Sequence, residues 1–206
     1  MTTTQEGDLQ SVQMLGLKLP TDPRWVRIAE IELEEILTDH AYCEQKAAMH
    51  CISIISRYPE HAKLVDELAP IVTEEWGHFR QVLAEMKKRN LALGRQRKDE
   101  YVNKLRGFMK KGLSREDKLL EELLVAGLIE ARSCERFRLL SLNIKEEELR
   151  GFYHKFMVSE AGHYVLFLDL ARTYFGKERT EARWQEYLDF EAKIMDGLEL
   201  RADRMH

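Results

Sequence analysis

Apolar residues recur at intervals of three and four along most of the chain, and no segment alternates apolar and polar positions as a half-buried strand would. This periodicity predicts an all-α protein. The 206 residues include four prolines and eleven glycines, and neither type clusters. Because these two residues interrupt helices most strongly, their scarcity favours long helices. The length is sufficient for one domain with a sizeable core.

Turn and capping signals separate an arm from a folded domain. We expect an irregular N-terminal arm over residues 1–21 and a single domain over residues 22–206. The dipeptide Asp22-Pro23 supplies an N-cap and a first-turn proline. The helical pattern that follows allows one break near residue 30 and ends at Pro59. Further helices are expected over about residues 60–90, 114–142, 145–175 and 178–200.

The connections between these helices indicate how they pack. Two helix pairs have short turns, whereas the connection over residues 91–113 is far longer than a turn within a bundle. Such a length suits a crossover between the second and third helices of a ferritin-like four-helix bundle. The pattern over residues 178–200 then predicts an extra C-terminal helix, whose apolar face contains Trp184, Tyr187, Leu188 and Ile194.

A Glu-x-x-His motif occurs twice. EEWGHF contains Glu75 and His78, and SEAGHY contains Glu160 and His163. Residues three apart lie on one face of a helix, so each pair can offer a carboxylate and an imidazole to one ion. One copy is a weak signal, because glutamate-rich helices contain it by chance. Two copies match helical bundles that hold two metal ions, in which two other helices each add one glutamate.

The positions of those other glutamates follow from antiparallel pairing, in which residues equally far from a turn meet. Glu75 lies 16 residues after Pro59, and Glu44 occurs at a similar distance before that turn. Glu160 lies about 16 residues after the second turn, and Glu130 occurs at a similar distance before it. The chain therefore contains two similar halves, each with a glutamate followed about 30 residues later by Glu-x-x-His.

Glu135 is an alternative to Glu130, because Cys134-Glu135 repeats the dipeptide Cys43-Glu44. Glu130 and Glu135 are five residues apart, which is about 140° around a helix, so both cannot face one ion. The distance from the turn favours Glu130.

Four buried carboxylates without compensation would be prohibitively costly, and a pair of divalent cations would satisfy them. Carboxylates and imidazoles without a thiolate suit iron or manganese better than zinc or copper, and we expect two iron ions. The alternative is that these glutamates lie at the surface or pair with Lys and Arg. No catalytic residue beyond the metal ligands and no organic cofactor site is expected. The expected ligands are Glu44, Glu75, His78, Glu130, Glu160 and His163.

Positive charge is concentrated between Lys87 and Lys118, a segment we call the basic strip. It contains twelve Lys and Arg against four acids, a balance of +8 in a chain of net charge −4. This asymmetry indicates a polyanionic partner, although a solvated crossover would give the same pattern. Arg132, Arg136 and Arg138 are expected to extend the strip. His40 is interpreted as a surface or core polar residue, and the three tryptophans, Trp25, Trp76 and Trp184, as packing residues.

Signals for export or membrane insertion are not found. The N-terminus has no basic and apolar leader pattern, and no apolar run is long enough to cross a bilayer. The three cysteines are an odd number without a Cys-x-x-Cys spacing, which favours a cytoplasmic protein with reduced thiols.

Four stretches carry a family resemblance: DHAYCEQKAA, EEWGHF, GLIEARSCERF and SEAGHY. Together they resemble the bacterial tRNA hydroxylases of the ferritin-like superfamily, over about residues 22–200. The resemblance implies a non-haem di-iron monooxygenase that hydroxylates the isopentenyl group of 2-methylthio-isopentenyladenosine next to the anticodon.

The same resemblance implies the partners of the chain. Oxygen would be the co-substrate, and an external donor of the ferredoxin or reductase type would supply two electrons. The tRNA anticodon loop would bind through the basic strip. Two alternatives remain at this point: a ferritin-like protein that oxidises and stores iron without an organic substrate, and a metal-free helical interaction module.

Overall fold

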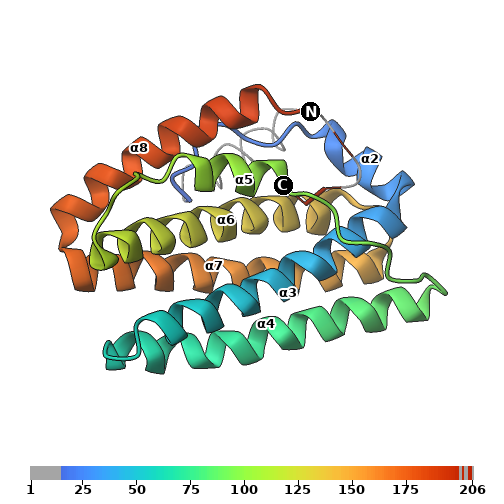
Figure 1. Ribbon diagram of the computed structural model, residues 1–206. Helices are drawn as coiled ribbons and strands as arrows, with labels where there is room; N and C mark the ends of the chain where they lie inside the picture. The colour runs from blue at the N-terminus through green and yellow to red at the C-terminus, as the bar shows by residue number, and fades with distance from the viewer. Residues whose placement is uncertain (1–14, 200, 202–203, 206) are drawn as a thin grey trace. The chain divides into compact units, whose positions relative to one another are not determined.

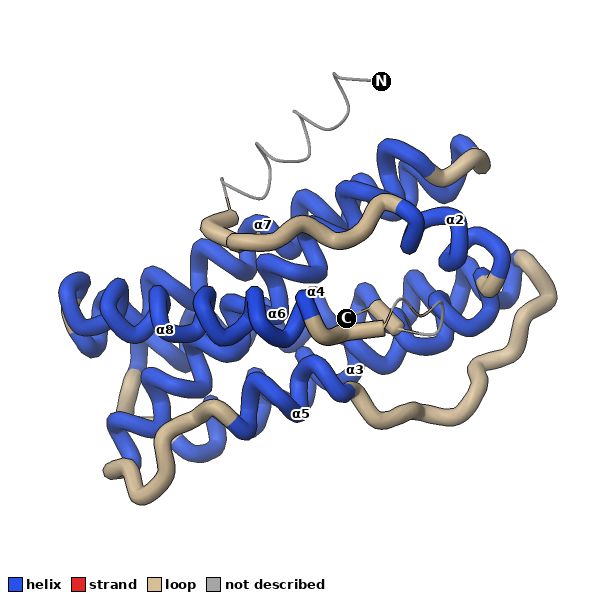
Figure 2. Tube along the Cα trace, turned by 90° about the horizontal axis from the view of Figure 1, so that it is seen from above, coloured by secondary structure: helices blue, strands red, loops and turns tan. Residues whose placement is uncertain are grey.

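The computed structural model describes residues 15–199, 201 and 204–205. Seven helices and no strand occur among these residues, which agrees with the all-α prediction (Figure 2). None of the described helices is both long and apolar enough to cross a membrane. The chain divides into two compact units. Unit 1 comprises residues 1–27, 99–200 and 206, and unit 2 comprises residues 28–98 and 201–205.

Unit 2 is built on a hairpin of two long helices, α3 (Leu33–Arg57) and α4 (Ala62–Lys88) (Figure 1). The short helix α2 (Arg24–Ile31) precedes α3, and the break between them at Glu32 agrees with the expected interruption. The apolar residues that recur at three and four form the core of the hairpin. Six of them are completely buried: Ile36, Leu37, Ile54, Leu64, Leu68 and Val82.

The first part of the crossover is fixed to α3 within unit 2. The Tyr42 hydroxyl donates to the carbonyl of Gly94 at 2.9 Å, and the Gly94 N–H lies 3.4 Å from Oγ1 of Thr38. A Cβ at position 94 would come within 3.2 Å of the Thr38 side chain, so glycine permits this close approach. Arg97 also forms an ion pair with Glu35.

Unit 1 contains a second hairpin, formed by α6 (Arg115–Asn143) and α7 (Glu147–Phe175), together with α8 (Lys177–Asp196) (Figure 1). The Ser114 side chain caps α6 by accepting from the Asp117 N–H at 3.0 Å and donating to its carboxylate at 2.7 Å. Gly176 ends α7 with a φ of 79°, a conformation that favours glycine. The C-terminal helix has the expected apolar face, since Trp184, Tyr187, Leu188 and Ile194 are buried.

The crossover contains a short helix that the sequence did not lead us to expect, α5 (Glu100–Gly107). Asp99 caps it by accepting from the Val102 N–H at 2.9 Å. Its two apolar residues, Tyr101 and Leu105, are four apart and completely buried in the structure. The signal was missed because only these two apolar positions lie among basic residues.

A buried ionic cluster connects α6, α8 and the arm in unit 1. The Arg132 guanidinium donates to Glu191 at 2.6 Å and to Glu135 at 3.0 Å, and also to the backbone carbonyl of Leu19 at 2.9 Å. Thr21 donates to Glu135 from both its backbone N–H and its hydroxyl, at 2.9 and 2.6 Å. Burial opposes the charge of Arg132, but the attraction of Glu191 and Glu135 outweighs it and raises the pKa of Arg132 above its ordinary value.

Two expectations about side-chain exposure are wrong. Arg132 and Arg136 do not extend the basic strip, because they are 0% and 6% exposed. Arg136 instead lies over the Trp25 ring at 4.7 Å. Trp25 and Trp184 pack in the core as expected, whereas Trp76 is 47% exposed.

Replacing Arg132 tests the role of the ionic cluster in stability. Arg132→Leu leaves Glu135 and Glu191 buried without their cation, so we expect the free energy of unfolding to fall by about 3–5 kcal/mol in urea denaturation. Arg172→Leu is the control, because Arg172 pairs with Asp169 and Glu181 at the surface. It should cost about 1 kcal/mol or less. Equal losses in the two variants would contradict a special role for the buried cluster.

Candidate metal centre

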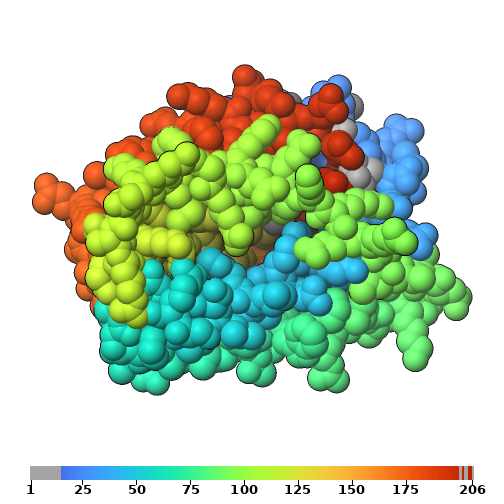
Figure 3. All heavy atoms as spheres, viewed as in Figure 1, coloured from blue at the N-terminus to red at the C-terminus, as the bar shows by residue number. Residues whose placement is uncertain are grey.

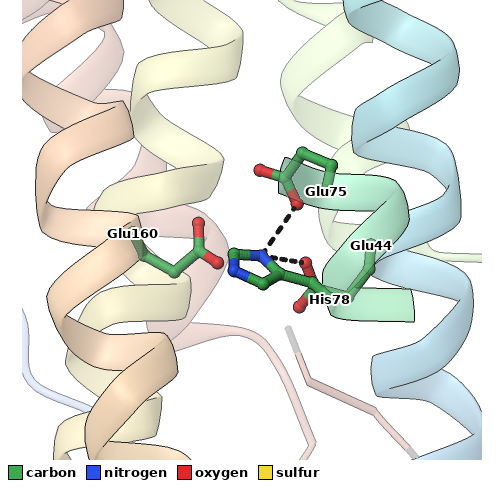
Figure 4. A group of neighbouring side chains, drawn as sticks. All are labelled: Glu44, Glu75, His78 and Glu160. Carbon is green, nitrogen blue, oxygen red and sulfur yellow. Dashed lines mark ion pairs between the residues drawn. The ribbon is translucent and has the colours of Figure 1, made fainter. Parts of the chain in front are cut away.

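The hairpin of unit 2 brings together three of the expected ligands, which we call the first triad. Glu44 comes from α3, and Glu75 and His78 come from α4. Nδ1 of His78 lies 3.5 Å from Oε2 of Glu44 and 3.4 Å from Oε2 of Glu75 (Figure 4). The three residues are 4%, 1% and 7% exposed in chain order. Two carboxylates and one imidazole nitrogen are thus gathered in the interior.

The hairpin of unit 1 gathers the other three expected ligands, which we call the second triad. Glu130 comes from α6, and Glu160 and His163 come from α7. Nδ1 of His163 lies 3.3 Å from Oε2 of Glu160. One ligand atom from each of the three residues lies within 4.8 Å of the others. Their exposures are 6%, 1% and 3% in chain order.

The two triads have the same construction. In each, the first helix of a hairpin supplies one glutamate, the second helix supplies Glu-x-x-His, and the histidine turns Nδ1 toward a carboxylate. Carboxylate oxygens and an imidazole nitrogen at this spacing are donors that a divalent cation of the iron or manganese type accepts. A cation also offsets the mutual repulsion of two buried carboxylates. The residues therefore fit a metal ion in each triad.

The second nitrogen of His78 also faces a carboxylate. Nε2 of His78 lies 3.9 Å from Oε1 of Glu74, which is one turn earlier on α4. The separation is longer than a hydrogen bond. It nevertheless places a negative charge on the side of the ring opposite Nδ1, an arrangement that favours a proton on Nε2 and leaves Nδ1 available to a metal.

Glu135, the alternative to Glu130, is engaged elsewhere. It is 2% exposed, and its two oxygens accept from Thr21 and from Arg132 in the ionic cluster. Glu135 therefore has a cation partner within the protein, whereas Glu130 lies with Glu160 and His163.

His40 is a polar residue near the first triad whose position was not anticipated. It is completely buried, and its Nε2 lies 2.7 Å from Oε1 of Glu44. The two residues are four apart on α3, a spacing at which helical side chains meet. This spacing was the available signal, but many residue pairs at this spacing are surface contacts, so it did not single out His40.

Comparisons with known proteins agree with this architecture. The model of the family tRNA-(MS[2]IO[6]A)-hydroxylase (MiaE) matches residues 9–206. A tRNA 2-(methylsulfanyl)-N(6)-isopentenyladenosine(37) hydroxylase from Pseudomonas putida is 39% identical over 170 residues, which cover 82% of this chain and 81% of that protein. A protein of the same name from Salmonella typhimurium is 27% identical, over 87% of this chain and 83% of its own length.

A solved structure extends the likeness to three dimensions. "Protein 43 with aldehyde deformylating oxygenase activity from Synechococcus" matches with a TM-score of 0.86 and 35% identity, over 92% of this chain and 94% of its own. This match confirms the all-α, ferritin-like fold class expected from the sequence. The family resemblance of the four quoted stretches is confirmed as well. Because the family model spans nearly the whole chain and the relative from Pseudomonas putida exceeds a third identity, the chain belongs to the tRNA-(MS[2]IO[6]A)-hydroxylase (MiaE) family.

Proposed function

We propose that this chain is a tRNA-modifying monooxygenase that hydroxylates the isopentenyl group of 2-methylthio-isopentenyladenosine next to the anticodon. The observation that carries the proposal is the pair of buried triads in a member of a tRNA hydroxylase family. Two curated relatives that cover more than 80% of the chain bear the name of this hydroxylase. A cytoplasmic location, expected from the sequence, suits a tRNA substrate.

We further propose that units 1 and 2 form one ferritin-like domain in which the triads hold two iron ions. The first triad would hold one ion and the second triad the other, so that each ion has a histidine of its own. The doubled construction supports this, because two Glu-x-x-His helices and two glutamate helices are the donor set of di-iron bundles. Manganese fits the same donors, and the oxygenase chemistry of the family favours iron.

Iron bound at these residues would supply the reaction with oxygen activation. The balance of the reaction is that a prenyl C–H bond, O₂, two electrons and two protons give an alcohol and water. The electrons come from an external donor of the ferredoxin or reductase type. The chain contributes carboxylates and imidazoles at fixed positions in a site that excludes bulk water. The modified base must leave its stack to reach a buried site, which costs less in an anticodon loop than in a duplex.

The alternative function, iron oxidation and storage without an organic substrate, is not favoured. The relatives are named as tRNA hydroxylases, and iron storage gives no reason for a segment with a charge balance of +8. We propose that this segment, the basic strip, binds the tRNA.

The structure separates the members of the basic strip by their contacts. Arg89 pairs with Glu85 on α4, and Arg97 pairs with Glu35 on α3, so both serve the fold. Lys104, Arg106 and Lys111 are exposed on α5 and on the loop that follows it. Figure 3 shows this yellow-green part of the chain at the surface. We propose these three residues as contacts to RNA phosphates.

Removing one ligand from each triad tests the metal site. We expect wild-type protein reconstituted with Fe²⁺ to contain about two iron ions per chain. Glu75→Ala and His163→Ala should each lower the iron content to about one or less, because each removes a donor from the interior. Glu67→Ala is the control, since Glu67 is exposed on α4. Helical content by circular dichroism should be unchanged in all three. Normal iron content in both ligand variants would refute the assignment.

Nucleoside mass spectrometry of total tRNA tests the reaction. We expect a strain that lacks the gene to lose the hydroxylated nucleoside and to accumulate its unhydroxylated precursor. A plasmid with the wild-type sequence should restore the product, and His163→Ala should not. A deletion strain with normal hydroxylated nucleoside but altered iron content would instead support the storage alternative.

Neutralising exposed residues of the basic strip tests the RNA contact. The triple variant Lys104→Gln, Arg106→Gln and Lys111→Gln should weaken binding to tRNA about tenfold or more at low salt. The salt dependence of binding, as log Kd against log salt, should become shallower by about 0.7–0.9 for each phosphate that the variant no longer neutralises. The control is Lys155→Gln, Lys177→Gln and Lys193→Gln, which changes the net charge equally at exposed positions of α7 and α8. Equal weakening by both triple variants would show that only net charge matters.

A further inference from the structure

The two oxygens of Glu44 have different surroundings within unit 2. Oε1 lies 2.7 Å from Nε2 of His40, and Oε2 lies 3.5 Å from Nδ1 of His78. Glu44 is 4% exposed and His40 is 0% exposed. One oxygen is therefore directed to a neighbour on its own helix, while the other is directed to the ligand atoms of the first triad.

The segment of α3 that carries His40 is fixed from two directions. The carboxylate of Asp39 accepts from the Met205 N–H at 2.8 Å, which ties the described C-terminal segment to this turn of the helix. Oγ1 of Thr38 lies 3.4 Å from the N–H of Gly94, in the first part of the crossover. Because helical geometry places residues four apart on one face, a fixed turn also fixes the His40 ring relative to Glu44.

The second triad has no counterpart of this histidine at the matching position. The residue four before Glu130 on α6 is Ala126, which has no polar side-chain atom. The two halves of the chain are thus similar in their ligands and different at the position that supports the first glutamate.

We propose that His40 is a positioning residue that makes Glu44 a ligand through one oxygen only, an inference that rests on the proposed metal site. The neutral imidazole with its proton on Nε2 donates to Oε1, so Oε2 alone is available to the metal ion of the first triad. At the matching position of the second triad, the side chain of Ala126 cannot donate to Glu130 in this way. The two metal ions are consequently inequivalent, although their ligand types are the same.

A matched pair of substitutions at His40 tests the proposal. His40→Gln retains an N–H donor on a side chain of suitable length, and His40→Met has a similar length without a donor. Both residues are good helix formers. We expect Fe²⁺ titrations of His40→Met to show one of the two ions bound about 10- to 100-fold more weakly, with the other unchanged. His40→Gln should bind both ions within about threefold of the wild type.

The thermal midpoint of the metal-free protein separates positioning from a merely structural role. A structural role would lower the midpoint in His40→Met without weakening one ion selectively, and that outcome would overturn the proposal. Unchanged affinity for both ions in His40→Met would overturn it too, while the metal site itself would stand. Failure of the wild type to bind two ions would instead refute the proposed function.

Mössbauer spectroscopy of the wild-type protein loaded with ⁵⁷Fe gives a test that does not depend on the folding of a variant. Two inequivalent ions predict two quadrupole doublets of equal area. In His40→Gln the two doublets should persist, and in folded His40→Met the parameters of one doublet should change. A single doublet in a wild type that contains two iron ions would contradict the inequivalence.

Discussion

Carboxylates repel one another at close range, and burial strengthens the repulsion because the protein interior screens charge poorly. Each hairpin of this chain nevertheless buries two glutamates beside a histidine. A divalent cation converts that repulsion into attraction. The residues that oppose folding when the site holds no metal then stabilise the loaded protein, since binding to the folded state alone shifts the equilibrium toward it. The proposed activity and the stability of the fold thus depend on the same charge compensation.

The chain compensates its other buried charges internally. Arg132 satisfies Glu135 and Glu191 in unit 1, at 3.0 and 2.6 Å. This contrast gives a physical reason why Glu135, despite its similar sequence surroundings, is not part of a triad. A buried carboxylate with a guanidinium partner is a structural element, whereas carboxylates grouped with an imidazole provide a donor set for a metal.

Periodicity and turn signals were sufficient to predict the long helices and the residues of each triad, because helical spacing and equal distance from a turn are geometric consequences of the sequence. They were not sufficient for α5, whose two apolar residues, Tyr101 and Leu105, are too few to give a period. Exposure of individual charged and aromatic side chains was also poorly predicted. Arg132 is buried because Glu191, 59 residues away, supplies its partner, and no local pattern contains that information. The contact of His40 with Glu44 was visible as a spacing but not as a function.

The account depends most on the six ligands of the two triads converging on one dinuclear centre. X-ray diffraction from crystals of the iron-loaded protein, with anomalous difference maps at the iron edge, tests this directly. We expect two peaks about 3.5–4 Å apart, one bonded to Glu44, Glu75 and His78 and the other to Glu130, Glu160 and His163. Two peaks far apart, or iron found only at surface carboxylates, would contradict it.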